Sequence, residues 1–446
     1  MYKPEVFTAD ELAKMRSDIR SNRVPGAYEP DKWSVSPFNR TESATSRMPK
    51  SIRLRDITLR TLEILPGVST TEEQKLEFVR GLVEAGVKDL VTAGRVHGRT
   101  VEAMRIETNL AHTISPDAKI AAICFSPADI EKIVSSGYDS VQVWLPPWGE
   151  ASLIYESTHS AAWRGEDWRD LQIPKDREGF ISRAIRTIKS ATAQGLDVTV
   201  CLLMVSYYSD IERFSETCRA LASTGVKEIA LFDGPGGVGP EAFATLVAAA
   251  KAVSPSVEIG VHPHNSFDLA LACAIASARA GADVIEVSVN GYCGGPGNAD
   301  LSSAAAAFEA LYGISTAIDL SHLTRLARLG EEITGYHVAW NHPVTGTEVF
   351  NWGGAEFLSQ EPLLDPMLHN CISPTSVGNV SKLPVTEHSG PFVMATKMES
   401  LGFDEGSREQ IERILVECQA MMRGERRIIG DEEITSIVRS ILGTDF

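Results

Sequence analysis

The sequence lacks the marks of an exported or membrane-spanning protein. Its 446 residues hold no uninterrupted apolar run of about 18 residues, and the N-terminal stretch carries acidic side chains where a signal peptide has an apolar segment. Seven cysteines are scattered singly, with no CxxC pair and no dense spacing pattern typical of disulfides. We therefore expect a soluble protein of the reducing cytoplasm.

An excess of positive charge is also lacking. Lys and Arg total 42 against 59 Asp and Glu, which gives a formal net charge of −17. The electrostatic field of such a molecule repels nucleic acids and anionic membranes, so we expect neither as a partner. An anionic substrate would need a local cluster of positive side chains.

From residue 51 onward, short β-branched runs alternate with longer helical patterns, and several helices end in a glycine that leads into an apolar strand. Strands are predicted at 52–57, 88–92, 119–124, 140–145, 197–204, 227–232, 257–262 and 283–289. Eight parallel strands, each followed by helical sequence, predict an α/β fold of the closed (β/α)8 TIM-barrel type. The competing open doubly wound sheet would carry GxGxxG after the first strand, where this chain has ITLRTLEILPG.

The same pattern predicts three parts of the chain. Residues 1–50 are polar and rich in Arg, Pro and Ser, which indicates an N-terminal extension, either an arm that contacts a partner or a disordered segment. The barrel is expected to occupy residues 51–313. Residues 314–446 are predicted to form a mainly helical C-terminal region that ends in an amphipathic helix.

Two histidines stand two residues apart at the end of the seventh predicted strand, in GVHPHNS. Residues i and i+2 point to the same side of a strand, so His262 and His264 can reach one metal ion at the barrel mouth, where the active sites of such barrels lie. Asn298, after the eighth strand, adds an amide oxygen that suits a hard divalent cation. The alternative is a pair of histidines that only form hydrogen bonds at a strand end.

Positive side chains follow the first two strands. Arg60, expected at the barrel mouth, is a candidate to bind a carboxylate or keto-acid oxygen bidentately, and on residue type alone a role without function is an equal alternative. Arg95, His97 and Arg99 form a cluster that would attract an anionic substrate, although a solvated helix N-terminus is an equal alternative. Cys293 lies on a glycine-rich turn after the eighth strand, either as a thiol that acts as an acid or as an inert loop cysteine.

A long segment follows the fourth strand and is rich in tryptophan. Four of the seven tryptophans fall on this segment or at its entrance: Trp144, Trp148, Trp163 and Trp168. At the catalytic face of a barrel, such a segment predicts a lid that excludes water. A contact between two subunits is the alternative.

These motifs, in this order, resemble the DRE-TIM metallolyase superfamily, which includes the isopropylmalate and homocitrate synthases, 3-hydroxy-3-methylglutaryl-CoA (HMG-CoA) lyase and 4-hydroxy-2-oxovalerate aldolase. The resemblance rests on DITLR with PGVS after it, on HPHN, and on NG followed by GNADL. Beyond the barrel, SPTSVG and EHSGPFVMATKMESLG are similar to the segment that follows the barrel in the synthases.

The resemblance implies a divalent metal ion, Mg, Mn or Zn, which polarises a bound 2-keto or 2-hydroxy acid while a carbon–carbon bond forms or breaks through an enolate. It identifies His262, His264 and Asn298 with metal-binding positions, and Arg60 with the arginine that contacts the keto-acid oxygens and the enolate. An acyl-CoA as second substrate and assembly as a homodimer are further expectations.

The first-strand motif departs from the family pattern. With PGVS fixing the register, DTTLRDGEQ reads DITLRTLEI, so Thr61 stands where the family has its metal-binding aspartate and Ile64 where it has a glutamine. A hydroxyl in place of a carboxylate removes one ligand charge, which weakens the binding of a divalent ion. Either Glu63 or Asp56, which matches a separate family aspartate earlier on the strand, is a candidate to compensate, and Glu63 is also a candidate for substrate binding. Sliding the register to make Arg55 and Asp56 the Arg–Asp pair would restore the ligand but break the PGVS match.

Later departures leave three functions open. The HESGIH of the synthases reads WGGAEF at 352–357, their later tyrosine is His369, and Cys293 appears in a turn reminiscent of the lyase. The leading hypothesis is a Claisen-type synthase that acts on an unusual 2-keto acid, with His97, Cys293 or His369 carrying protons. A retro-aldol or retro-Claisen lyase is the alternative, and a ligand-binding homologue without catalysis, prompted by Thr61, is the third.

Overall fold

The computed structural model describes residues 8–94, 96, 98–125, 127–145, 177–351, 365 and 367–443. These fall into two compact units, the barrel unit, Phe38–Val338, and the terminal unit, in which Met1–Pro37 joins Ala339–Phe446. The expected borders at 50 and 313 both fall within the barrel unit, and the division into three parts stays a prediction.

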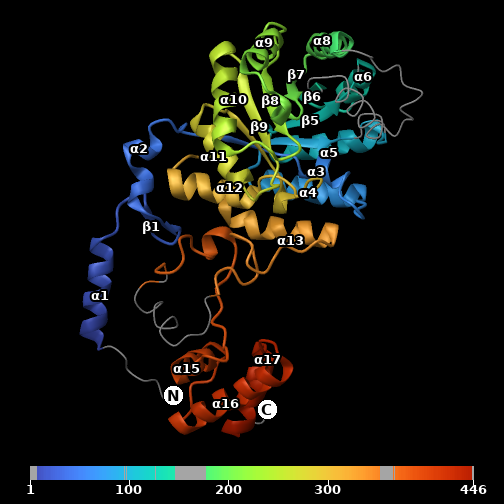
Figure 1. The fold of residues 1–446 in the computed structure, drawn as a ribbon. Helices are drawn as coiled ribbons and strands as arrows, with labels where there is room; N and C mark the ends of the chain where they lie inside the picture. The colour runs from blue at the N-terminus through green and yellow to red at the C-terminus, as the bar shows by residue number, and fades with distance from the viewer. Residues whose placement is uncertain are drawn as a thin grey trace. The chain divides into compact units, whose positions relative to one another are not determined.

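Eight parallel strands close into a barrel in the order β10-β3-β4-β5-β6-β7-β8-β9. Figure 1 labels β5 to β9 of this barrel. The strands are β3 (Arg53–Asp56), β4 (Asp89–Ala93), β5 (Lys119–Cys124), β6 (Ser140–Leu145), β7 (Asp197–Leu202), β8 (Glu228–Asp233), β9 (Glu258–Pro263) and β10 (Val284–Val287). The ring closes where β10 pairs with β3, with Val287 opposite Asp56. The predicted (β/α)8 barrel is confirmed, and the predicted strand ends agree with the observed ones to within two residues.

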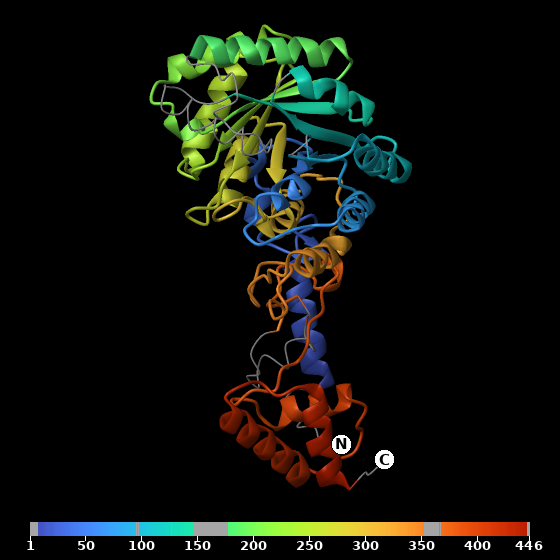
Figure 2. The ribbon, with the colours of Figure 1, turned by 90° about the vertical axis from the view of Figure 1, so that its right-hand side faces the viewer.

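Helices surround these strands (Figures 1 and 2). They are α3 (Thr58–Leu62), α4 (Glu72–Glu84), α5 (Val101–Ile114), α6 (Pro127–Ser135), α8 (Arg177–Ala193), α9 (Ile211–Ala222), α10 (Pro240–Val253), α11 (Ala270–Arg279), α12 (Leu301–Ala307) and α13 (Leu323–Thr334). A capping box of Thr71 and Gln74 begins α4, and Gly86 follows its end with φ +89°. A Cβ at Gly86 would lie 2.5 Å from the carbonyl oxygen of Ala317, so only glycine fits this junction.

Charged side chains tie the starts of the strands together inside the barrel. The Arg55 guanidinium, which is 5% exposed, donates two hydrogen bonds to Glu228, of 2.8 and 2.6 Å, and one of 2.9 Å to Asp89. Glu228 and Asp89 are the first residues of β8 and β4. This buried network joins three strands at the base, the end of the barrel opposite the one where active sites lie.

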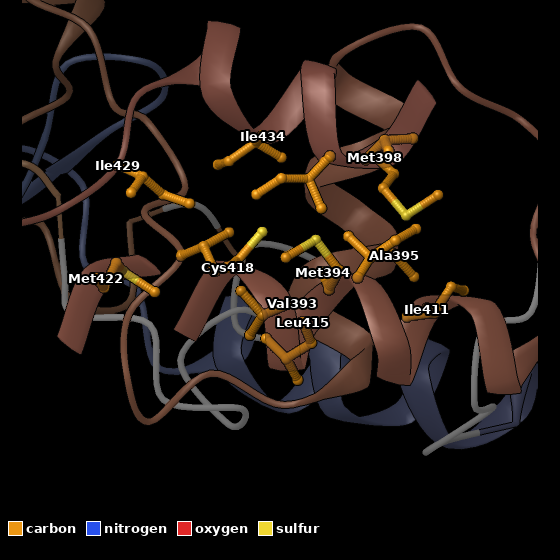
Figure 3. Close-up of a cluster of buried hydrophobic side chains, with 14 residues drawn as sticks. Val393, Met394, Ala395, Met398, Ile411, Leu415, Cys418, Met422, Ile429 and Ile434 are labelled. Atoms are coloured by element: carbon orange, nitrogen blue, oxygen red, sulfur yellow. The ribbon is translucent and has the colours of Figure 1, made fainter. Parts of the chain in front are cut away.

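The terminal unit is mainly helical, as predicted for the C-terminal region, and contains α1 (Ala9–Ser21), β1 (Tyr28–Glu29), β2 (Trp33–Ser34), α15 (Pro391–Ser400), α16 (Arg408–Glu425) and α17 (Asp431–Leu442). Its apolar core, shown in Figure 3, includes Met394 and Met398 of α15 and Ile411 of α16. No helix in the described part of the chain is long and apolar enough to cross a bilayer.

Candidate active site

A cavity of about 300 Å³ lies at the C-terminal ends of the barrel strands. Its polar lining comprises Arg60 after β3, His262 and His264 of β9 and the turn after it, Ser266, and Cys293 beyond β10. Most of the remaining wall is apolar and consists of Ile64, Trp144, Leu203, Met204, Phe232, Pro235 and Pro296 together with glycines. A small apolar pocket with a few convergent polar groups is typical of a site for a small molecule.

The two histidines lie together, as their spacing predicts. The ring centroids of His262 and His264 are 5.0 Å apart, and the side chain of His262 is nearly fully buried. Cys293 completes a group of three whose nitrogen and sulfur atoms all lie within 4.8 Å of one another. Among the residues whose placement is described, this is the only group of three or more His, Cys, Asp or Glu side chains spaced closely enough to hold a metal ion.

Glu286 of β10 holds His262 in place, a role that the sequence analysis missed. Its Oε2 lies 2.9 Å from Nδ1 of His262, and Glu286 is fully buried. Burial alone would raise the pKa of this carboxyl, but the hydrogen bond and charge of His262, with the charges of Arg60 and Arg55, lower it to about 2. Because Nδ1 faces a carboxylate, Nε2 of His262 is the nitrogen left for a metal. The sequence signal that could have indicated this role is the single acidic residue within the apolar strand sequence VIEV.

The Cys293 thiol faces the histidine pair, with its Sγ 3.7 Å from Nε2 of His264. Burial alone would raise the pKa of this thiol, but hydrogen bonds with His262 and His264 and the charges of both rings lower it to about 5. The thiolate is the form that binds metals and accepts protons. The structure therefore places Cys293 within the candidate site.

Arg60 lies buried in the cavity wall, with 3% of its surface exposed. Its guanidinium carbon is 5.7 Å from the ring centroid of Trp144 and 5.8 Å from that of Phe232. Its Nη2 lies 3.5 Å from the Glu286 carboxylate, yet Nε and Nη2 donate no hydrogen bond. Buried donors without acceptors are costly, so this guanidinium is arranged to receive a ligand with acceptor oxygens.

Asn298 lies beside His264, to which its backbone is bridged, and it is 2% exposed. Its Oδ1 accepts a hydrogen bond of 2.6 Å from the Ser288 hydroxyl, whereas its Nδ2 donates none. The amide oxygen predicted to bind a metal is therefore already used by Ser288 in this orientation of the amide group.

Thr61 and Asp56 are buried, and neither lines the cavity. The Thr61 hydroxyl lies 2.7 Å from the carbonyl oxygen of Tyr292, the residue before Cys293. The Asp56 carboxylate accepts hydrogen bonds of 2.9 and 2.8 Å from the backbone and hydroxyl of Thr58. Burial raises the pKa of Asp56 to about 7, although these hydrogen bonds and the charge of Arg60 act to lower it.

The other predicted residues lie elsewhere. Arg99 is buried between α4 and α5, where it pairs with Glu72 at 2.5 Å and Glu107 at 2.8 Å, and it does not line the cavity. Glu63 caps the end of α3 outside the cavity lining, and His369 is an exposed residue of the terminal unit. Four parts of the predictions lie outside the described residues: Arg95, His97, the tryptophan-rich segment from 146 to 176 and WGGAEF at 352–357.

Known proteins resemble this chain at the level of sequence and of fold. A sequence model of the HMGL-like family matches residues 51–329. A homocitrate synthase of Methanothermobacter thermautotrophicus is 26% identical over 413 residues, which are 92% of this chain and 99% of the relative. A protein of Methanopyrus kandleri named as a probable 2-isopropylmalate synthase is 28% identical over 369 residues, 82% of this chain and 69% of the relative.

Solved structures share the barrel fold. HMG-CoA lyase of Bacillus subtilis superposes with a TM-score of 0.54 at 21% identity and covers 65% of this chain and 96% of the lyase. An HMG-CoA lyase of Acinetobacter baumannii, solved with coenzyme A and 3-methylmalate, superposes with a TM-score of 0.52 at 17% identity and covers 65% of this chain and 93% of that one.

Proposed function

The chain belongs to the HMGL-like family, and we propose that it is an acyltransferase that forms a carbon–carbon bond by condensing an acyl-CoA or similar donor with a 2-keto acid. The reaction is of the Claisen type and passes through an enolate. The enzyme class has the support of relatives named homocitrate and 2-isopropylmalate synthase, which match over most of this chain. A cytoplasmic homodimer is part of the proposal.

The state of Arg60 carries this proposal. A keto acid offers oxygens that accept hydrogen bonds, and Arg60 presents unpaired donors to the cavity at Nε and Nη2. In a water-poor cavity, the guanidinium would stabilise the negative charge that develops on the enolate. The apolar residues Ile64, Leu203 and Met204 line the same cavity, so we expect the keto acid to carry an apolar substituent.

The donor set fits a divalent metal ion. Glu286 fixes the ring of His262, and Nε2 of His264 lies 3.7 Å from Sγ of Cys293 in a group whose donor atoms are all within 4.8 Å of one another. These two histidines would hold the ion, which would act as a Lewis acid on the keto acid. Asn298 stays a proposed ligand, because turning its amide group over would let Nδ2 donate to Ser288 and leave Oδ1 free for the ion.

Proton transfer is assigned to Cys293 first among the candidates. It lines the cavity, and hydrogen bonding with both histidines lowers its pKa to about 5, so near neutral pH it can accept a proton. His97 and His369 stay candidates from the sequence, and so do Arg95, Arg99 and Glu63 for substrate binding.

The extent of the similarity favours a synthase over the lyase. The homocitrate synthase matches 92% of this chain, and therefore most of the terminal unit as well as the barrel. The Bacillus subtilis lyase is matched over 96% of its own length but covers only 65% of this chain. A carbon–carbon lyase is the second candidate, and Cys293 in the turn after β10 is the feature that favours it.

The test is release of free CoA thiol from acetyl-CoA in the presence of a panel of 2-keto acids. We expect release with a keto acid that carries an apolar substituent, little release with 2-oxoglutarate, and loss of activity in His262→Ala. His112→Ala is the matched control, because His112 lies on α5 and pairs with Asp139. Cleavage of a 4-hydroxy-2-keto acid to pyruvate without any CoA release would replace the synthase with the lyase. Absence of both reactions would leave the ligand-binding homologue.

A further inference from the structure

We propose that Cys293 supplies the third protein ligand of the metal site, in place of the carboxylate lost at Thr61, and that the site therefore selects Zn²⁺ over Mg²⁺. The inference rests on the proposed function only in that His262 and His264 bind an ion. It puts Cys293 in the place proposed above for Asn298, whose Oδ1 stays with the Ser288 hydroxyl, and it leaves proton transfer to His97 or His369. It concerns which ion is bound and what completes its coordination.

The spacing of the three donors fits a tetrahedral zinc ion. A nitrogen at about 2.05 Å and a sulfur at about 2.3 Å from Zn²⁺ lie roughly 3.6 Å apart in a tetrahedron. Sγ of Cys293 is 3.7 Å from Nε2 of His264, and the donor atoms of all three residues lie within 4.8 Å of one another. Three protein ligands leave one position of a tetrahedral ion open, which is the usual arrangement of catalytic zinc.

The surroundings orient these donors before an ion binds. Glu286 accepts the Nδ1 proton of His262 at 2.9 Å, the outer-shell contact that metal-binding histidines ordinarily have. Gly297 closes the turn that carries Cys293, and a Cβ there would lie 2.1 Å from the carbonyl oxygen of Gly291. The turn is thus too tight for a side chain at this position, which limits where the thiol can lie.

Thr61, which replaces the metal-binding aspartate of the family pattern, contacts the backbone next to the proposed new ligand Cys293. The residue stands where the family pattern has its aspartate, and its hydroxyl lies 2.7 Å from the carbonyl oxygen of Tyr292. Tyr292 directly precedes Cys293, so this hydrogen bond anchors the backbone that presents the thiol. Thr61 thus does not bind the ion itself but positions Cys293, which does. Thr61 is therefore a positioning residue.

The exchange of donors changes the preferred ion. Carboxylate, amide and water oxygens suit Mg²⁺, whereas thiolate together with imidazole suits Zn²⁺ and its spectroscopic substitute Co²⁺. We therefore expect the purified protein to retain zinc in preference to magnesium when both are supplied.

The experiment is metal titration of the full-length protein after chelator treatment, with Co²⁺ absorption and competition for Zn²⁺ against a chromophoric chelator as readouts. In the wild type we expect a near-ultraviolet band of thiolate-to-Co²⁺ charge transfer. Cys293→Ala should lose this band and bind Zn²⁺ at least about 100-fold more weakly, because loss of an outer-shell contact alone costs 10–100-fold.

Two further variants make the result specific. Cys273→Ser is the matched control, because Cys273 is equally buried but donates to the Val238 carbonyl oxygen at 3.3 Å, and it should keep both the band and the affinity. Thr61→Val keeps the shape of the side chain but removes the hydroxyl, which lies 2.7 Å from the carbonyl oxygen of Tyr292 and 2.9 Å from that of Thr58 in its own helix. It should weaken Zn²⁺ binding about tenfold and diminish the Co²⁺ band, which a purely structural role would leave unchanged. If Cys293→Ala fails to fold, Thr61→Val and the wild-type band decide the question.

The outcomes separate this inference from the proposed function. A wild-type Co²⁺ complex without the charge-transfer band, or full Zn²⁺ affinity in Cys293→Ala, overturns the thiolate ligand even where condensation of a keto acid is observed. The band without any condensation supports the ligand set and rejects the synthase. Failure of the wild type to bind Co²⁺ or Zn²⁺ overturns the thiolate ligand, and condensation of a keto acid with Mg²⁺ in the same preparation would leave the proposed function standing.

Discussion

The base and the mouth of the barrel each bury an arginine from the same stretch of chain, and the two meet opposite surroundings. Arg55, at the base, has its guanidinium paired with Glu228 and Asp89. Arg60, at the mouth, leaves Nε and Nη2 without acceptors and has one carboxylate at 3.5 Å. Both are at most 5% exposed, so burial does not distinguish them. The difference teaches that a satisfied buried charge ties the strands together, whereas the donors left on Arg60 are those that the proposed function uses for the ligand.

Arg55→Met should produce the largest effect on stability. The change removes the positive charge while keeping much of the side-chain volume, and it takes from the buried Glu228 and Asp89 their buried partner, leaving only the partly exposed Arg53 beside them. We expect the free energy of unfolding, measured by urea denaturation, to fall by about 3–5 kcal/mol. Arg325→Met is the control, because Arg325 is exposed and pairs with Glu84, and the change should alter stability by less than about 1 kcal/mol. Equal losses in the two variants would contradict the role of the base network.

Arg60→Met should affect activity instead of stability. Removal of a donor aimed at developing negative charge lowers kcat by about 10²–10³-fold, equivalent to roughly 2.7–4 kcal/mol in the transition state. The free energy of unfolding should fall by less than in Arg55→Met, because the nearby Glu286 keeps Arg55 at 3.5 Å and His262 at 2.9 Å as partners. Thiol release and urea denaturation on one preparation measure both quantities. A stability loss as large as that of Arg55→Met would remove the distinction between the base and the mouth.

Asp56 lies between Arg55 and Arg60 in the sequence, and its protonation state shows whether a buried charge between the base and the mouth is stabilised. Burial raises its pKa from 3.8 to about 7 in the folded protein. The folded state therefore holds a proton that the unfolded state has lost, and stability decreases as the pH rises from about 4 through 7. Between pH 5 and pH 7 the decrease amounts to about 2–3 kcal/mol, at roughly 1.4 kcal/mol per pH unit.

Asp56→Asn provides the measurement, because an amide has no charge to lose. Unfolding free energies of the wild type and the variant are determined across this pH range, and their difference isolates Asp56 from all other titrating groups. The variant should gain stability relative to the wild type as the pH rises. A difference that is independent of pH would show that the folded protein does not hold this proton.

The sequence predicted the strands and the histidine pair of the candidate site better than the hydrogen bonds that join these residues to other strands. Strand positions follow from hydrophobic runs between glycine-terminated helices, and the i, i+2 spacing of His262 and His264 follows from the geometry of one strand. Contacts between distant strands carry no such local signal. The bond between Glu286 and His262 depends on the pairing of β9 with β10, and that between Thr61 and Tyr292 on how two turns meet.

Arg99 is a second case in which the sequence could not reveal the contacts of a side chain. Its position after the second strand suggested a substrate contact, yet its ion pairs reach Glu107 on α5 and Glu72 on α4. Which charges a buried arginine meets is decided by helix packing, and a list of residue types contains no information on that packing. Asn298 likewise lies at the predicted place, while its partnership with Ser288 became visible only in three dimensions.

Glu286→Gln gives the smallest expected effect. It tests whether Glu286 supports the metal site at the mouth or only the charged network at the base. Glu286 lies 3.5 Å from both Arg55 and Arg60, so it borders both regions, and it also contacts His262. Glutamine keeps an oxygen for the Nδ1 proton but loses the charge that makes the imidazole a stronger ligand. We expect Zn²⁺ affinity to fall about tenfold, at the lower end of the range for outer-shell changes. Glu258→Gln, at the start of β9 and paired with Arg53, is the matched control and should leave the affinity unchanged. Equal Zn²⁺ affinities in the wild type and Glu286→Gln would assign Glu286 to the base network alone.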